Sequence, residues 1–143
     1  LAQINFKPII AEELLITLFL SVGLLSILGH MFSPFLLFRG GKGIATAAGI
    51  LLFLSWPCAL LTLLVWLLFA TIFKTSSLGA LTASISAPLF FWSLKEVVNT
   101  GLLPNSLRIS NIEIYIVLII VILIWIKHIP NIKRIIKGIE SKI

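Results

Sequence analysis

Long apolar runs fill most of this chain and leave it little polar surface. Apolar residues make up 59% of its 143 residues and charged residues only 11%, whereas a soluble domain carries about 25% charged residues. Because such a chain cannot cover itself with polar side chains, the lipid bilayer is its expected solvent. In lipid every backbone polar group needs an internal partner, so helices are expected, and no long alternating strands indicate a barrel.

Five apolar stretches predict an all-α integral membrane protein, a single-domain bundle of about five transmembrane helices. They lie at about 12–32, 43–56, 57–73, 76–94 and 112–127. Two of them are near the roughly 20 residues that a span needs, and shorter spans can cross a thin region of bilayer. Small residues recur in the first, second and fourth stretches, and in lipid they allow helices to pack closely.

The tail is predicted as a separate amphipathic helix over residues 131–143. Its isoleucines recur at helical spacing among lysines and one arginine, which is typical of a helix on the membrane surface. Pro130 has no N–H and disfavours helical geometry in the residue before it. We therefore expect Pro130 to separate the tail from the fifth span.

The positive charges predict the orientation. If the five stretches alternate in direction, eight Lys and Arg residues lie on one side and three on the other. By the positive-inside rule the richer side is cytoplasmic. Its cations are Arg39, Lys42, Lys74, Lys127, Lys133, Arg134, Lys137 and Lys142, and those opposite are Lys7, Lys95 and Arg108. The glycine-rich stretch, the turn at 74–77 and the C-terminal tail are then expected on one cytoplasmic face.

The sequence Arg-Gly-Gly-Lys-Gly at 39–43 is a candidate phosphate site. Glycines let backbone N–H groups approach a ligand, and successive N–H groups can form an anion nest. The helix expected after Gly43 would direct its positive end to the same place. Because Gly43 follows Lys42 in place of Ser or Thr, this is not a Walker A loop. On composition alone, a flexible turn with cations that set the topology is equally favoured.

A second candidate cluster follows the fifth stretch. His128 can exchange a proton near neutral pH, Asn131 can polarise a carbonyl, and Arg134 lies one turn further on. By themselves these residues favour a structural interpretation, in which His128 reaches the interface and Asn131 caps the tail helix. Likewise Ser76 and Ser77 can cap the fourth helix or contact a phosphate.

Several classes of function are disfavoured. The chain has no Asp and a single cysteine, Cys58, so a Ser-His-Asp triad, a disulfide and a cysteine metal site are excluded. No acidic residue lies in the interior of a predicted span, because Glu12, Glu13, Glu96 and Glu113 all sit at span ends, which argues against a proton relay or a cation transporter. The net charge of +6 does not indicate nucleic acid, because the cations punctuate apolar runs and no groove-reading motif is present. We expect no cofactor and no metal.

Three segments carry a family resemblance. Residues 29–46, with Gly29-His30-x-Phe32 and Phe38-Arg39-Gly40-Gly41-Lys42-Gly43-Ile44-Ala45-Thr46, closely resemble the second signature of the bacterial acyl-phosphate-dependent (PlsY-type) glycerol-3-phosphate acyltransferases. The third signature looks present as His128-x-x-Asn131-Ile132-x-Arg134, followed by Gly138 and Glu140. Between them, Ser76-Ser77-Leu78-Gly79 and Pro88 resemble the serine-containing turn and helix of the family.

The resemblance implies a seven-helix enzyme of the bacterial inner (plasma) membrane with its active face and C-terminus in the cytoplasm. Such an enzyme transfers a fatty acyl group from acyl-phosphate to the 1-hydroxyl of sn-glycerol 3-phosphate, giving lysophosphatidate in phospholipid biosynthesis. Its implied partners are these two substrates, membrane lipids and an upstream enzyme that forms acyl-phosphate. It needs no metal and does not use acyl-CoA directly.

The same resemblance implies residue roles. His128 and Asn131 would line the reaction centre, and His128 or a substrate phosphate oxygen would take the acceptor proton. The residues that would bind substrate phosphate are Arg39, Gly40, Gly41, Lys42, Gly43, Ser77 and Arg134.

The first signature of the family and its first two helices have no counterpart here, so we expect the chain to correspond to helices three to seven. An inactive fragment is then one interpretation. Two alternatives stay open, a transporter for an anionic or phosphorylated solute and a non-catalytic membrane subunit. An inverted repeat would favour the transporter, and none is visible in the five stretches.

Overall fold

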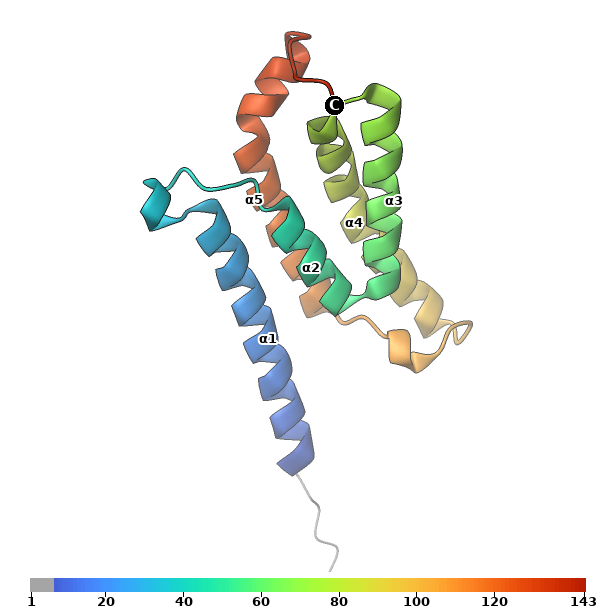
Figure 1. Cartoon of the computed structure of the whole chain (residues 1–143). Coiled ribbons are helices and arrows are strands. Elements are labelled where there is room, and N and C mark those ends of the chain that lie inside the picture. Colours follow the sequence, from blue (N-terminus) through green and yellow to red (C-terminus); the bar gives the residue numbers. More distant parts are fainter. Residues whose placement is uncertain (1–6) are drawn as a thin grey trace, which may run out of the picture.

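The computed structural model describes the backbone of residues 7–143 and the side chains of Leu14 and residues 17–143. This part of the chain is helical and contains no strand. The elements are α1 (Lys7–Met31), η1 (Pro34–Leu36), α2 (Ile44–Leu54), α3 (Trp56–Phe73), α4 (Ser76–Asn99), η2 (Asn105–Leu107) and α5 (Asn111–Ile136). The five predicted helices are therefore all present (Figure 1).

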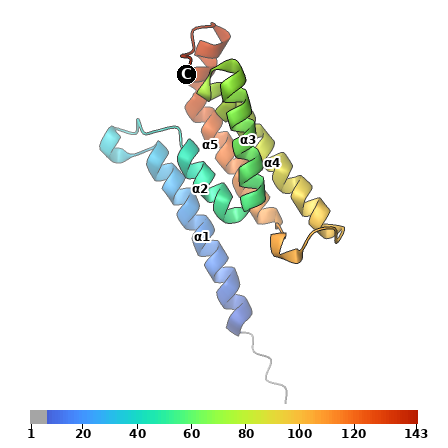
Figure 2. The same cartoon turned by 45° about the vertical axis from the view of Figure 1, so that its right-hand side comes forward.

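Helices α3, α4 and α5 form the body of the bundle, and α2 lies against them, while α1 stands at the side and packs on α2 and α5 (Figures 1 and 2). The most extensive contact is between α3 and α4. It is close because Gly79 has no side chain, and a Cβ there would stand 2.7 Å from the Trp66 carbonyl oxygen. This is the use of small residues that the sequence predicts for lipid.

Within the described residues, four helical segments are long and apolar enough to cross a membrane, at Thr17–Leu36, Trp56–Phe73, Ser76–Asn99 and Asn105–Ile136. Helix α2 has only 11 residues and is about 16 Å long, roughly half the thickness of a bilayer core. The second stretch thus forms a helix that is too short to span alone. Its buried residues Ala47 and Leu51 pack against the body of the bundle.

The predicted break at Pro130 is wrong, because α5 runs through Pro130 to Ile136. A proline can be tolerated inside a membrane helix where local adjustments satisfy the freed carbonyl. The helix ends at Ile136 with Lys137 as its C-cap, and the next residue, Gly138, has a left-handed φ of 68°. The Gly138 N–H bonds the Ile135 oxygen and the Ile139 N–H bonds the Arg134 oxygen, which is the Schellman pattern.

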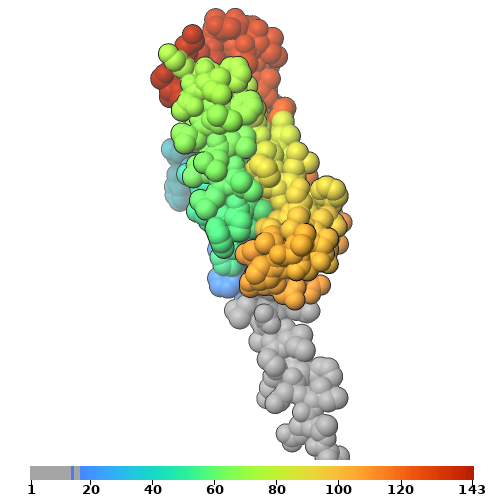
Figure 3. Space-filling view, turned by 90° about the vertical axis from the view of Figure 1, so that its right-hand side faces the viewer, coloured from blue at the N-terminus to red at the C-terminus, as the bar shows by residue number. Residues whose placement is uncertain are grey.

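No separate tail helix forms over 131–143, because residues 131–136 belong to α5, and the last residues fold back toward the start of α4. The N–H of Ile143 donates to the Lys74 carbonyl oxygen at 2.8 Å, so the tail crosses to the α3–α4 turn. Figure 3 shows the C-terminal residues at the same end of the molecule as the end of α3. The glycine-rich loop, the α3–α4 turn and the tail therefore lie at one end of the bundle, as alternation predicts, and η2 lies at the other (Figure 1).

Candidate active site

A polar pocket of about 260 Å³ lies where these three cationic segments meet. Five of the predicted site residues line it, namely Lys42, Ser77, His128, Asn131 and Arg134. The other polar residues of its wall are Ser76, Glu140, Ser141 and Lys142, and its apolar wall includes Ile44, Trp66 and Ala80. Residues that are up to a hundred positions apart in the sequence are thus assembled at one place.

Helix α5 supplies one side of the pocket. His128, Asn131 and Arg134 follow each other at intervals of three residues, so they project from one face of a continuous helix. The uninterrupted course of α5 through Pro130 is what keeps them in this register. A helix break at Pro130 would have separated His128 from the other two.

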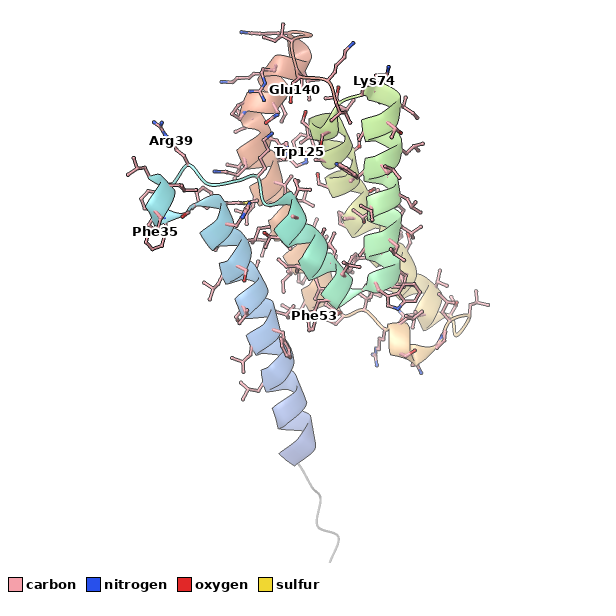
Figure 4. The ribbon with its side chains drawn as sticks, viewed as in Figure 1. Phe35, Arg39, Phe53, Lys74, Trp125 and Glu140 are labelled. Atoms are coloured by element: carbon pink, nitrogen blue, oxygen red, sulfur yellow. The ribbon has the colours of Figure 1, made fainter. Side chains whose placement is uncertain are left out.

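The carboxylate of Glu140 organises the donors of the pocket. It accepts hydrogen bonds from Ser77 Oγ at 2.6 Å, from Asn131 Nδ2 at 2.5 Å and from Arg134 Nε at 2.6 Å. Figure 4 shows Glu140 at the end of the bundle to which the α3–α4 turn with Lys74 belongs. Burial alone would raise the pKa of Glu140, but the hydrogen bonds from Ser77, Arg134 and Asn131 and the charge of Arg134 lower its pKa from 4.5 to about 2.

His128 is held in one tautomer. Its side chain is buried, and its Nδ1 lies 2.8 Å from the Ile124 carbonyl oxygen. Because a carbonyl oxygen only accepts, Nδ1 carries the proton, and in the neutral ring Nε2 is left as the acceptor. His128 therefore offers a proton acceptor at the wall of the pocket.

Lys42 reaches the pocket from the glycine-rich loop, while its neighbours do not. Arg39, Gly40, Gly41 and Gly43 are absent from the pocket wall, and Arg39 lies at the outer end of the loop, away from Glu140 (Figure 4). Phosphate binding by the whole stretch 39–43 therefore stays a prediction. Lys42 is the member of this group that lies beside His128 and Asn131.

The glycines of this loop allow it to lie against the end of α1. A Cβ on Gly40 would overlap the backbone of His30 and Met31, and one on Gly41 would overlap the His30 ring. The Gly41 N–H also donates to the His30 oxygen at 3.1 Å. Gly43 has a left-handed φ of 77° at the N-cap of α2. Close packing thus accounts for these glycines and fixes the position from which Lys42 extends.

Lys127 joins the end of α1 to α5. Its Nζ donates to the Met31 carbonyl oxygen at 2.8 Å and lies 5.0 Å from the centre of the Phe32 ring. A cation is favourable at a helix C-terminus, where carbonyl oxygens lack helical partners. The loop that carries Lys42 is thereby attached to the helix that carries His128.

An apolar cavity of about 400 Å³ adjoins the polar pocket and shares Ile44, Trp66 and Ala80 with it. Four helices line it, and on each the first and last lining residues are seven positions apart, as Ala80 and Ala87 are on α4. Seven residues of helix correspond to about 10 Å. A polar, cationic pocket therefore opens onto an apolar space along the bundle.

Sequence reasoning gave no site role to three polar residues of the pocket wall, Glu140, Ser141 and Lys142. The available signal was that Glu140 is the only carboxylate of a tail otherwise rich in cations. Among the residues that the structure describes, no group of three His, Cys, Asp or Glu side chains could hold a metal ion.

Comparisons with known proteins agree on one family. A sequence model of the family "Glycerol-3-phosphate acyltransferase" matches residues 2–138. A glycerol-3-phosphate acyltransferase of Methylococcus capsulatus is 36% identical over 126 residues, which cover 88% of this chain and 57% of that protein. One of Neisseria meningitidis serogroup A is 44% identical over 126 residues, which cover 86% of this chain and 55% of that protein.

Two crystal structures of PlsY (YgiH), an integral membrane glycerol 3-phosphate acyltransferase, are similar to this fold. The glycerol 3-phosphate form matches with a TM-score of 0.68 at 36% identity, over 85% of this chain and 54% of that one. The lysophosphatidic acid form matches with a TM-score of 0.65 at 37% identity, over 83% of this chain and 54% of that one. The chain thus spans about half the length of these relatives. Together with the four apolar helices, these matches identify a multi-pass membrane protein.

Proposed function

Because the chain belongs to the glycerol-3-phosphate acyltransferase family, we propose that it carries out acyl transfer in phospholipid biosynthesis. The donor is an acyl-phosphate, the acceptor is the 1-hydroxyl of sn-glycerol 3-phosphate, and the products are lysophosphatidate and inorganic phosphate. The observation that carries the proposal is the meeting of Lys42, Ser77, His128, Asn131 and Arg134 in one pocket beside an apolar cavity.

The donor set of the pocket suits phosphate. Lys42, Arg134 and Lys142 bring positive charge, and Ser77 and Asn131 bring neutral donors. Charge-assisted hydrogen bonds of this kind are stronger than neutral ones. Ser77, Asn131 and Arg134 donate to the Glu140 carboxylate, and Asn131 and Arg134 keep further N–H groups that can donate to a phosphate oxygen.

The reaction needs positioning more than activation, because an acyl-phosphate is already a reactive mixed anhydride. The acceptor oxygen forms a bond to the acyl carbon, and the bond from that carbon to the phosphate oxygen breaks. The hydroxyl proton passes to Nε2 of His128, with an oxygen of the substrate phosphate as the rival acceptor. Asn131 and Lys42 would stabilise the negative charge that develops on the acyl oxygen.

The apolar cavity suits the acyl chain of the donor. Its walls are aliphatic and small side chains from α2 to α5, and burying each methylene of a chain there is favourable by about 0.8 kcal/mol. An amphiphile would then lie with its phosphate beside Lys42 and its chain along the bundle. The shared residues Ile44, Trp66 and Ala80 mark where head and chain meet.

The charge distribution supports a location in the bacterial inner membrane with the pocket facing the cytoplasm. The pocket lies at the end of the bundle with the glycine-rich loop and the tail, where eight of the eleven cations are found. Positive residues favour the cytoplasmic side. Both the polar acceptor and a donor released by a cytoplasmic acyl-phosphate-forming enzyme can reach such a pocket.

The test is acyl transfer by the chain in liposomes, given palmitoyl-phosphate and labelled glycerol 3-phosphate. We expect labelled lysophosphatidate. Its yield should fall in Lys42→Ala and stay unchanged in the matched variant Lys133→Ala, which removes an exposed cation from the C-terminal part of α5. Flux of glycerol 3-phosphate into the liposomes without product would favour the transporter. The proposal would be contradicted if the chain formed no product and also showed no Lys42-dependent binding of glycerol 3-phosphate.

A further inference from the structure

The loop between α1 and α2 leaves its apolar side chains uncovered. Phe35 is 96% exposed, Leu37 81%, Phe38 65% and Leu36 58%. Four consecutive large apolar residues in contact with water would be unfavourable, and a patch of this kind marks an interaction surface.

Four backbone N–H groups of the same loop are hydrogen-bonded within the loop. The N–H groups of Leu36 and Phe38 donate to the Ser33 oxygen, that of Leu37 to the Pro34 oxygen and that of Arg39 to the Leu36 oxygen, all at 2.9–3.1 Å. Pro34 has no N–H to satisfy. The apolar side chains thus point outward while these N–H groups are bonded inward. A lipid environment requires this arrangement, whereas a turn that faces water does not need it.

The loop accepts backbone strain to keep this arrangement. Leu37 and Phe38 have φ values of 48° and 62°, in the left-handed region. Bulky residues are uncommon there, whereas glycine would adopt the conformation freely. Large apolar side chains at both positions are favourable if their surface is removed from water outside the chain.

The position of the loop indicates what shields its apolar side chains from water. The apolar segment of α1 and η1 ends at Leu36, so the loop lies where this segment leaves the hydrocarbon. The exposed surface of α1, with Leu25 at 67%, continues into it. In Figure 4 the Phe35 ring points to the α1 side of the loop and Arg39 points the opposite way. Apolar residues on one side and a cation on the other match the acyl and phosphate levels of a lipid leaflet.

We propose that residues 34–39 form an interfacial membrane anchor. The side chains of 35–38 insert at the boundary of the acyl region of the leaflet, and Arg39 lies among the lipid phosphates. Lys42 follows three residues after Arg39, so the anchor sets the depth at which Lys42 stands relative to the membrane surface. This role does not depend on acyl transfer.

The test is spin-label accessibility in the whole chain, reconstituted in nanodiscs of phosphatidylethanolamine and phosphatidylglycerol. Single variants Phe35→Cys, Leu37→Cys and Arg39→Cys are labelled, with Leu25→Cys as the lipid reference and Lys137→Cys as the water reference. Cys58 is buried, and the unsubstituted chain checks that it does not react. Collisions with oxygen report lipid, and collisions with a nickel chelate report water.

We expect labels at 35 and 37 to resemble the label at 25, with nickel collisions several-fold fewer than at 137. The label at 39 should collide with nickel much more often than those at 35 and 37. Nickel collisions at 35 and 37 equal to those at 137 would overturn the proposal, because the loop would then face water. Few collisions with either reagent would also overturn it, since protein, from a second copy or another segment, would then cover the loop.

Discussion

The hydroxyl of Ser77 donates to the carboxylate of Glu140 at 2.6 Å across 63 positions of sequence. This bond joins the first turn of α4 to the tail that follows α5. With the bond from the Ile143 N–H to the Lys74 oxygen, it holds the tail across the polar pocket. The tail is therefore part of the site.

Replacing Glu140 should loosen this end of the bundle. Asn131 is buried, and Glu140→Ala leaves its Nδ2 without the acceptor it has here, at a cost of about 1–3 kcal/mol. Glu140→Gln keeps an oxygen acceptor and should cost less. Denaturation in detergent measures the difference, with Ser141→Ala as the neighbouring control. Equal stability of Glu140→Ala and the control would contradict the assignment.

Attachment of the tail should fail in acid. The pKa of Glu140 is lowered from 4.5 to about 2 in the folded chain. The stability it contributes is therefore fully present above about pH 5 and is lost as the pH falls from 4.5 toward 2. Digestion of the tail by carboxypeptidase should accelerate over this range in the natural chain. In Glu140→Gln the rate should lack this pH-dependent step, and identical profiles would refute the role of the carboxylate.

Gly40 should tolerate no side chain, unlike Gly49. A Cβ on Gly40 meets the His30 and Met31 backbone, which cannot rotate away, whereas nothing lies within 4 Å of a Cβ on Gly49. Gly40→Ala should destabilise the fold by about 1–3 kcal/mol and displace Lys42, while Gly49→Ala, in the middle of α2, should be neutral or stabilising. Denaturation of the two variants side by side checks this, and equal effects would count against the packing.

His128 should affect turnover more than substrate binding if it takes the acceptor proton. A general base contributes typically 10²–10⁴-fold, so His128→Gln should lower kcat by about that factor with little change in KM for glycerol 3-phosphate. Because His128 is buried, the thermal stability of the His128→Gln variant is measured as well. A properly folded His128→Gln variant with nearly full kcat would identify the substrate phosphate as the base.

Much of the site could be predicted from the sequence, because the positions of most of its residues follow from helical spacing or from the alternation of the helices. Intervals of three residues place His128, Asn131 and Arg134 on one helix face, and alternation of the helices brings Ser77 and Lys42 to the same end. Glu140 could not be placed, because its position depends on the chain reversal at Gly138 and on bonds to Ser77 far away in sequence.

The glycine-rich loop shows a second limit of prediction from the sequence. Glycine indicates that something approaches the backbone closely, but the sequence does not say what. The group that approaches Gly40 and Gly41 is the end of α1, whereas sequence reasoning considered only a phosphate. Pro130 misleads for a similar reason, since a proline breaks a helix in water more readily than in a membrane bundle.

The most direct test of the account is calorimetric binding of glycerol 3-phosphate to the reconstituted chain, compared between Lys42→Ala and Lys133→Ala. Loss of a hydrogen bond between charged groups costs about 1.5–3 kcal/mol, so Lys42→Ala should weaken binding by about 10- to 100-fold. Lys133→Ala should bind like the natural chain. Equal affinity of the two variants would contradict a phosphate site at Lys42.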